Sequence, residues 1–280
     1  MPHPLHALRT GALLAMMTLT GLQVQAEPVV KAAAVPAGPT ATLTLADAQA
    51  RLTVAVDGAG SYTDALLEDA GGAYLADLAF RSMLLFNGEM PLPDLVKQVD
   101  PATARSRFSA AGAEVNLLQR LEAGPMPGTF LLTQQYRLHN PGAADLSLVL
   151  SRYHDSDLFD PNGVHTDAGY LPRKKRWAYL MSELAPRASV MTKFVGINLA
   201  GGDEPRRVVR VCCDRPPVDA TENGVVAGDD NGDRVSDYAG DRTLMQQRSV
   251  TIPAGGTTRV VTQALLGAAH LSGVRALPQD

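Results

Sequence analysis

Apolar and polar residues alternate along much of the chain with a period of two, the pattern of a half-buried β-strand. The alternation predicts a strand pair over 43–56, with a turn at Asp57-Gly58-Ala59-Gly60. Over 63–86 the apolar residues also fit helical spacing in places. Two glycines, Gly71 and Gly72, interrupt that run, so two strands joined at the glycines are favoured. A further strand is expected over 115–121.

Two hairpins are the clearest predicted elements. Each combines two alternating segments with a turn built from Asn, Pro or Gly, which is a strong hairpin signal. The segments are 130–138 with 146–153 around Asn140-Pro141-Gly142, and 243–252 with 257–266 around Pro253-Ala254-Gly255-Gly256. Two more candidate strands lie at 190–199 and 206–213.

These elements predict a mainly β fold. Many short strands with Gly/Pro turns, and no convincing long helix, indicate an antiparallel β-sandwich with little helix rather than a parallel sheet. We expect a single sandwich domain over 41–270, after a flexible leader at 27–40 and before a C-terminal tail at 271–280. A hydrophobic content of 45% is enough for a substantial core.

The first 26 residues have the three parts of a signal peptide. Arg9 lies in a start without acidic residues, a short apolar run covers 11–22, and Val24-Gln25-Ala26 ends in small residues before Glu27. An uncleaved anchor is the alternative. No later stretch is apolar for long enough to span a bilayer. We therefore expect a periplasmic or secreted protein that does not span the membrane.

The overall charge limits the kinds of partner. The formal net charge is -4, which makes nucleic acid an unfavourable partner. A glycan or another component of the cell envelope is the class of partner that we keep open.

The two cysteines, Cys212 and Cys213, are neighbours. A disulfide between adjacent residues closes a small strained ring, because the Cα atoms of ordinary disulfides lie farther apart than neighbouring Cα atoms do. Two buried thiols are therefore the favoured prediction. A bridge between the neighbours, intermolecular pairing and metal binding stay open.

An acidic segment at 228–241 has the spacing of a calcium loop. Its alternate positions one, three, five, seven and nine are Asp229, Asn231, Asp233, Val235 and Asp237. Carboxylates, an amide and the Val235 carbonyl are ligands that Ca²⁺ takes. The nine residues resemble the D-x-N-x-D-x-x-x-D loops of dockerins and thrombospondin type 3 repeats, which implies calcium binding. The chain departs from that pattern at position six, where Arg234 replaces glycine, and at position twelve, where Gly240 replaces glutamate. An acidic surface loop is the alternative.

A second polar cluster follows the first predicted hairpin, where a rigid scaffold often carries functional loops. Three carboxylates are candidate Ca²⁺ ligands, and two histidines with one carboxylate are a candidate Zn²⁺ site, the less expected of the two metals. The carboxylates are Asp155, Asp157 and Asp160, and the other group is His154 and His165 with either Asp155 or Asp167. The hairpin with its Tyr-His-Asp-Ser-Asp-Leu ending resembles strands of exported bacterial β-sandwich proteins, a likeness that implies no activity. A plain polar turn is the alternative.

A basic run, Arg173-Lys174-Lys175-Arg176, ends at the only tryptophan, Trp177. The run is a candidate anion site, and Trp177 with Tyr170 and Tyr179 is a candidate platform for a sugar ring. The alternative is a solvated charged face and a tryptophan in the core.

Sequence motifs for catalysis are missing: there is no G-x-S-x-G, no H-E-x-x-H, no P-loop and no G-x-G-x-x-G. The leading hypothesis is a non-catalytic, exported β-sandwich that is stabilised by Ca²⁺ and serves as a binding or surface-associated module. One alternative is a carbohydrate-active enzyme, lyase-like or mutarotase-like, with His154 or His165 as general base or acid near paired carboxylates. A zinc hydrolase at the same cluster is another.

Overall fold

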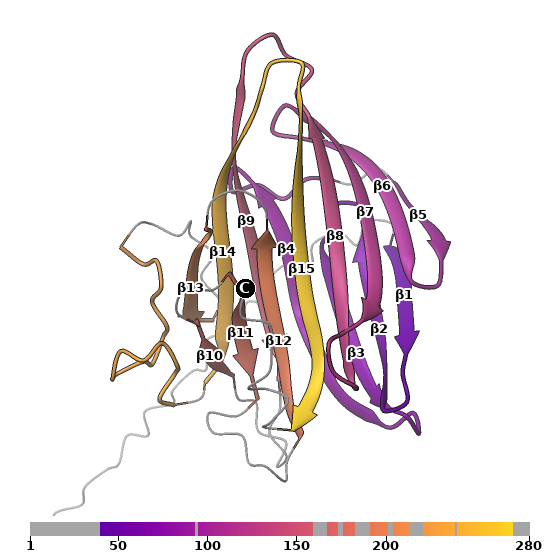
Figure 1. Ribbon diagram of the computed structural model, residues 1–280, viewed down its shortest axis with the longest axis vertical. Coiled ribbons are helices and arrows are strands. Elements are labelled where there is room, and N and C mark those ends of the chain that lie inside the picture. The colour runs from indigo at the N-terminus through magenta and orange to yellow at the C-terminus, as the bar shows by residue number, and fades with distance from the viewer. Residues whose placement is uncertain are drawn as a thin grey trace, which may run out of the picture. The chain divides into compact units, whose positions relative to one another are not determined.

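The computed structural model describes residues 40–92, 95–158, 167–172, 176–182, 191–200, 204–212, 221–238 and 240–270. These residues contain strands and no helix, and the strands form two antiparallel sheets (Figure 1). All of them belong to one compact unit, Ala37–Asp280. The predicted mainly β, antiparallel sandwich is confirmed.

The first sheet, sheet A, has seven strands. In spatial order they are β1 (Thr40–Ala46), β2 (Ala50–Asp57), β3 (Tyr62–Asp69), β4 (Tyr74–Phe86), β9 (Leu146–Asp157), β14 (Arg242–Ile252) and β13 (Arg206–Val211). The predicted strand pair over 43–56 is confirmed as β1 and β2. The predicted pair joined at Gly71 and Gly72 is confirmed as β3 and β4.

The second sheet, sheet B, has eight strands. In spatial order they are β10 (Ala168–Tyr170), β11 (Ala178–Met181), β12 (Met191–Ala200), β15 (Thr257–His270), β8 (Thr129–His139), β7 (Ala113–Ala123), β6 (Thr103–Ala110) and β5 (Leu95–Asp100). Strands β7 and β12 match the predicted segments 115–121 and 190–199. Strands β5 and β6 were not predicted.

Both predicted hairpins have the right strands and the wrong pairing. Strand β8 pairs with β7 and β15 in sheet B, whereas β9 pairs with β4 and β14 in sheet A. Strands β14 and β15 are divided between the sheets in the same way. The turns Asn140-Pro141-Gly142 and Pro253-Ala254-Gly255-Gly256 therefore carry the chain from one sheet to the other. Period-two alternation shows which side of a strand is buried, but it does not identify the strand that pairs with it. A turn within one sheet and a turn from one sheet to the other therefore give the same sequence pattern.

The two crossing turns are bonded to each other. The Asn140 side-chain amide donates to the Ile252 and Pro253 carbonyl oxygens, at 3.2 Å each, and the Gly255 N–H donates to the Gly142 carbonyl at 3.0 Å. Asn140 is almost fully buried, so these bonds compensate for the removal of its amide from water. The turns thereby fix the two crossings side by side.

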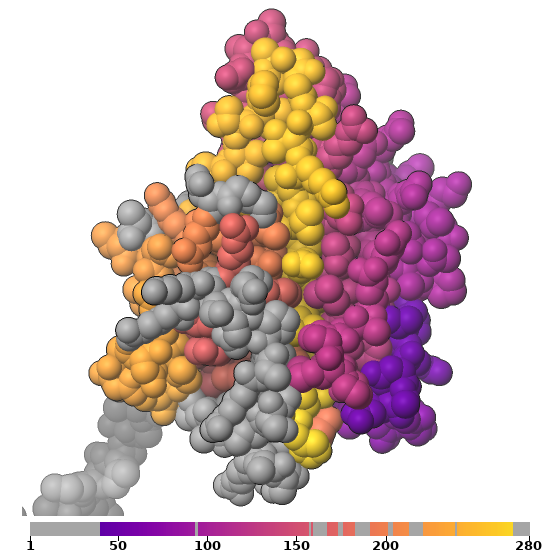
Figure 2. All heavy atoms as spheres, in the orientation of Figure 1, coloured from indigo at the N-terminus to yellow at the C-terminus, as the bar shows by residue number. Residues whose placement is uncertain are grey.

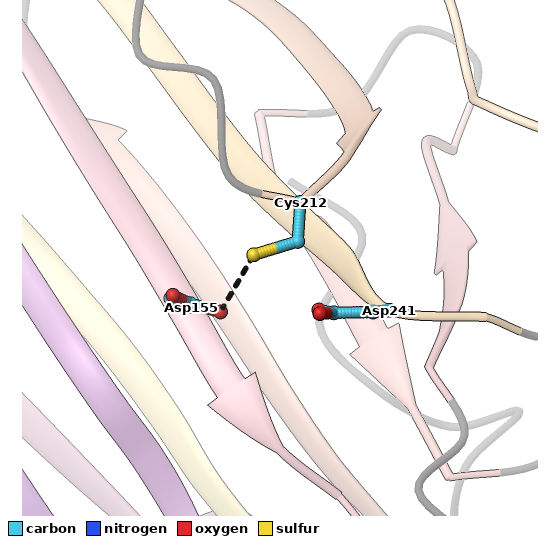
Figure 3. A group of neighbouring side chains, drawn as sticks. All are labelled: Asp155, Cys212 and Asp241. Atoms are coloured by element: carbon cyan, nitrogen blue, oxygen red, sulfur yellow. Dashed lines mark hydrogen bonds between the residues drawn. The ribbon is translucent and has the colours of Figure 1, made fainter. Parts of the chain in front are cut away.

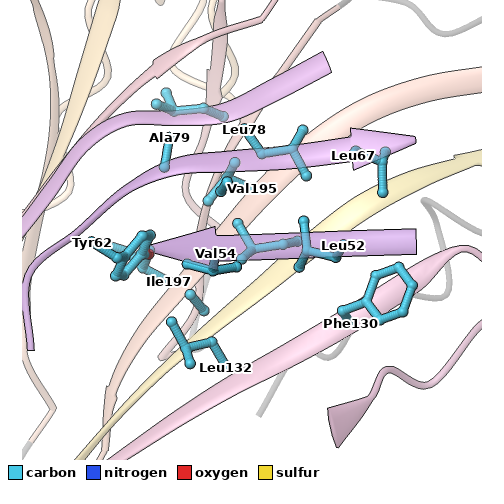
Figure 4. Packing of buried hydrophobic residues seen from close by; sticks show 14 of the residues in the cluster. Leu52, Val54, Tyr62, Leu67, Leu78, Ala79, Phe130, Leu132, Val195 and Ile197 are labelled. Carbon is cyan, nitrogen blue, oxygen red and sulfur yellow. The ribbon is translucent and has the colours of Figure 1, made fainter. Parts of the chain in front are cut away.

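The core lies between the sheets. Strand alternation sends large aliphatic and aromatic side chains inward from both sides, as Figure 4 shows. Leu52, Leu67 and Leu78 come from sheet A, and Phe130, Leu132 and Ile197 from sheet B. Complete burial of side chains of this size contributes about 1.5–3 kcal/mol each.

The turn between β2 and β3, Asp57–Ser61, is folded into this core. Its carbonyl oxygens accept hydrogen bonds from side chains of the surrounding strands: Gln119 donates to Asp57, Ser106 to Gly58, and Gln134 and Arg152 to Gly60. Gly60 has a φ of 90°, and a Cβ there would lie 1.9 Å from the Tyr136 hydroxyl. Only glycine therefore fits at position 60.

Candidate functional site

The outer face of sheet B carries a group of basic side chains that we call the basic face: Lys97, Arg105, Arg107, Arg137 and Arg259. They come from β5, β6, β8 and β15, and all five are exposed. Figure 2 views the protein from this side, with β15 in yellow beside the magenta strands. Inward neighbours of these residues, such as Phe108 and Leu138, are buried, so the pleat of each strand fixes the direction of its cation.

The strand register arranges these cations in two rows across the sheet. In the first row, Leu95, Arg107, Asn116, Arg137 and Arg259 lie opposite one another on successive strands. Two arginines, Arg137 and Arg259, are thus direct cross-strand neighbours.

The second row is displaced by two residues along each strand. It contains Lys97, Arg105, Leu118, Gln135 and Val261. Here Lys97 and Arg105 are direct cross-strand neighbours, so each row holds one pair of like charges.

The two rows surround a concave region of about 820 Å³. All five cations line it, together with the amides of Asn116 and Gln135, and no acidic side chain does so. Within the part of the chain that the structure describes, none of the five cations has an ion pair or a side-chain hydrogen bond. Like charges directly opposite each other destabilise a sheet. The basic face therefore has chemistry for an anion, and an acidic side chain beside it, Glu114, lines a neighbouring hollow with Arg107.

Aromatic side chains occupy another part of the same outer face. Tyr170 on β10 stacks on Tyr179 of β11, which stacks on Trp177, with ring centroids 6.0 and 6.1 Å apart. Gly196 leaves the room that Tyr179 needs, because a Cβ there would lie 2.4 Å from its ring. Trp177 and Tyr179 are buried, and burial raises the pKa of Tyr179. The predicted association of these three rings is seen, but two of them are packed away from solvent.

The predicted calcium loop has its carboxylates turned back onto its own backbone. Asp229 accepts hydrogen bonds from the N–H groups of Gly232, Asp233 and Arg234, and Asp233 accepts one from Val235. Asp237 accepts bonds from the Asp230 N–H and the Asn231 amide. At position six, Arg234 has a φ of 70°, the left-handed conformation that favours the glycine usual there.

The first two residues of the second polar cluster, His154 and Asp155, lie on opposite faces of sheet A. His154 is fully buried in the core, whereas Asp155 faces outward, because successive strand residues alternate. The two therefore do not meet. Asp167 is buried near Ser156, whose hydroxyl lies 3.5 Å from its carboxylate. The side chain of Asp157, and residues Asp160 and His165, lie outside the described part of the chain, as do 173–175 of the basic run.

His154 is held as a neutral ring. Its Nε2 donates to the Leu78 carbonyl oxygen at 3.2 Å, so Nδ1 is the acceptor that faces the Tyr62 hydroxyl at 3.4 Å. Burial, together with the positive charge of Arg152, lowers the pKa of His154 to about 3. This environment stabilises the core and gives the ring no access to a substrate or a metal.

A small group of possible metal ligands lies at the end of β9. Asp155, Cys212 and Asp241 offer ligand atoms that are all within 4.8 Å of one another (Figure 3). Cys212 is disulfide-bonded, so the predicted thiol is wrong at this position. The only other cysteine of the chain, Cys213, lies outside the described residues. A disulfide sulfur has no proton to donate, so its 4.0 Å separation from Asp155 is a contact, and two carboxylates remain as ligands.

Sequence reasoning missed the basic face because its residues come from four strands, two of which were not predicted. One signal in the sequence predicts strand β6: exposed Arg105 and Arg107 alternate with buried Ala104, Ser106 and Phe108. Nothing in the sequence shows that β8 lies beside β15, the pairing that places Arg137 opposite Arg259.

No helix of the described residues has the length and apolar character that crossing a membrane requires.

No protein-family model matches the chain, and no curated protein matches it. Among solved structures, the chain is similar to a galactose mutarotase-like protein from Lactobacillus casei ATCC 334, at 6% identity and a TM-score of 0.42, over 82% of this chain and 100% of that one. It is also similar to a family GH92 inverting mannosidase from Bacteroides thetaiotaomicron VPI-5482, at 10% identity and a TM-score of 0.39, over 84% of this chain and 29% of that one. A heparan sulfate lyase mutant from Pedobacter heparinus gives 10% identity and a TM-score of 0.38, over 81% of this chain and 37% of that one. Likenesses this weak carry no argument about function.

Proposed function

We propose that this protein is a binding module for a multivalent anionic ligand, which it holds on the basic face. The observation that supports the proposal is the set of five exposed cations around one concave region without an ion pair among the described residues. A sheet without a ligand gains nothing from two pairs of like charges placed directly opposite each other. An anion between them removes that repulsion.

The chemistry of the side chains fits carboxylate, sulfate or phosphate groups. Four of the five cations are arginines, whose planar guanidinium groups bind such oxyanions with two parallel hydrogen bonds. The strands hold these arginines in fixed positions relative to one another. The net charge of the whole chain is -4, so the basic face is a local concentration of positive charge on an acidic protein.

The test compares two double variants of equal charge. Arg137→Gln/Arg259→Gln removes the like-charged pair of the first row, and Arg51→Gln/Arg210→Gln removes two arginines of sheet A that already have partners, Glu68 and Glu222. Titration with dextran sulfate at low salt should show binding by the unaltered protein and by the control. The first variant should bind roughly 100-fold more weakly, from about one charge-assisted hydrogen bond lost per arginine.

Neutral dextran serves as the negative probe. Binding of neutral dextran with the same affinity, or equal weakening by the two double variants, would contradict the proposal.

We also keep calcium as a proposal for the loop at Asp229–Asp237. The left-handed conformation of Arg234 supports it, since this is the conformation that calcium loops require at position six. The test is a thermal melt with Ca²⁺, described below. His154 faces the core, so its position favours neither the carbohydrate-active enzyme nor the zinc hydrolase.

A further inference from the structure

We propose that the anionic ligand is an acidic polysaccharide that lies across the strands of sheet B, from β5 toward β15. The inference rests on the proposed function and adds the class of ligand and its direction. It follows from how the cations are spaced, and from which neutral side chains lie between them.

The spacing of the cations requires an extended ligand. Each row crosses five strands, β5, β6, β7, β8 and β15. Neighbouring strands are about 4.8 Å apart, so the Cα atoms at the two ends of a row are separated by about 19 Å. Arg107 and Arg137, with Asn116 between them, are about 10 Å apart by the same spacing. One small anion reaches one or two of these cations, and only a chain of linked units reaches all of them.

The neutral side chains indicate a ligand with hydroxyl groups as well as charges. Asn116 lies between Arg107 and Arg137 in the first row, and Gln135 lies in the second row. Within the described residues, neither amide has a side-chain hydrogen bond. An amide both donates and accepts, which suits a sugar hydroxyl, whereas a sulfate group or a fully ionised phosphate only accepts. The aliphatic side chains of Leu95, Leu118 and Val261 offer contact to the C–H faces of sugar rings.

Other polyanions fit this face less well. Single-stranded nucleic acids bind on exposed aromatic side chains that stack with the bases, and neither row contains an aromatic residue. A lipid surface is flat on this scale, whereas the cations line a hollow of about 820 Å³. An acidic polysaccharide combines repeated charge, hydroxyl groups and a narrow flexible chain.

The first experiment is a length series of galacturonate oligomers, from one to eight units, titrated into the full chain by calorimetry. Affinity should rise steeply with length and level off once the oligomer spans the row, with the octamer at least about 100-fold tighter than the monomer, because linked charges bind with high effective concentration. Monomer affinity equal to that of the octamer would overturn the inference. Binding of inorganic polyphosphate without binding of any galacturonate oligomer would overturn it too and leave the proposed function intact.

The second experiment separates hydroxyl recognition from charge. Asn116→Ala should weaken binding of the galacturonate octamer by roughly tenfold, the effect of about one hydrogen bond, and leave binding of inorganic polyphosphate unchanged. Gln98→Ala is the matched control, because the Gln98 amide donates to the Thr42 carbonyl at 2.7 Å and so has a partner in the protein. Polyphosphate that binds more tightly than galacturonate octamer, or that loses the same factor in Asn116→Ala, would contradict the recognition of hydroxyl groups. Equal melting temperatures would exclude misfolding of the variant.

Discussion

The basic face and the acidic loop at Asp229–Asp237 each concentrate charge of one sign. The acidic groups have hydrogen-bond partners within the protein, and the basic groups have none among the described residues. In the loop, the Asp229 carboxylate accepts hydrogen bonds from the N–H groups of Gly232, Asp233 and Arg234. The backbone of the loop therefore stabilises this negative charge. On the basic face, the described residues provide no partner for any cation, and two pairs of like charges stand directly opposite each other.

A charged group with partners inside the protein stabilises the fold, whereas a charged group without them is available to bind a ligand. Carboxylates that accept hydrogen bonds from several N–H groups stabilise their own turn. This structural role explains these residues without any ligand. Cations fixed on strands without a partner raise the energy of the free protein slightly and need a ligand to explain them. A high density of charge is therefore a weak sign of function until its partners are known.

The comparison is tested most strongly by reversing one charge on the basic face. Arg137→Glu should weaken binding of dextran sulfate by about 100-fold or more, since it removes an attractive contact and adds a repulsive one. Asp233→Ala, in the acidic loop, removes a negative charge and should leave the affinity unchanged or slightly higher. Calorimetric titration of both variants measures the contrast. If Asp233→Ala weakened binding of dextran sulfate and Arg137→Glu did not, the acidic loop and not the basic face would be the binding region.

Acid unfolding measures a third titratable group, His154, which is neutral in the folded protein at pH 7. The pKa of His154 is about 3 in the folded protein and near 6.5 when exposed, so its contribution to stability is full above pH 6.5 and falls as the pH drops toward 3. At pH 5 the loss is about 2 kcal/mol by this linkage. His154→Gln should flatten the fall in melting temperature between pH 7 and pH 5. Asp57, whose pKa is raised by burial, acts in the opposite direction at lower pH. An unchanged slope in His154→Gln would contradict the neutral buried ring.

Calcium tests whether the acidic loop has a second role beyond its own hydrogen bonds. If Ca²⁺ binds only the folded loop, ten times its Kd stabilises the protein by about 1.4 kcal/mol. The melting temperature should then rise by about 3–6 °C. Mg²⁺ should act less, and Asp233→Ala should abolish the shift. No shift at saturating Ca²⁺, with no calcium found by metal analysis, would leave the loop purely structural.

The smallest expected effect is the cost of the like-charged pair in the first row. Arg259→Thr should stabilise the free protein by about 0.2–1 kcal/mol, because it removes the repulsion with Arg137 and introduces a residue that favours strands. The melting temperature should rise by roughly 1–4 °C at low salt. Arg51→Thr is the control, since Arg51 lies 3.9 Å from Glu68. Destabilisation by Arg259→Thr would show that Arg259 has a structural role.

The sequence was sufficient for the fold class and for most strands, and it was insufficient for the pairing. Period-two alternation over 130–138 identified β8, and the glycines at 71 and 72 separated β3 from β4. Asn140-Pro141-Gly142 turned the chain as expected. Its direction, across the sandwich and not back along one sheet, depends on contacts with Ile252 and Pro253 that are distant in sequence.

The candidate sites differ in the same way. All the residues of the acidic loop lie within one short segment, so their spacing in sequence is their spacing in space. His154 and Asp155 are neighbours in sequence, yet the strand sends them to opposite faces of sheet A. Arg107 and Arg259 are far apart in sequence and meet in one row only through the order of β6, β7, β8 and β15.

The position of β15 governs when this fold is able to form. It is the last strand of the described chain, yet it lies between β12 and β8 and joins the two parts of sheet B. During synthesis, β5–β8 and β10–β12 are therefore left with unpaired edges until residues 257–270 emerge. Such late, long-range pairing makes folding slow and leaves open strand edges that promote aggregation. A chain cut before Thr257 keeps nearly all of its core residues and loses the strand that brings them together.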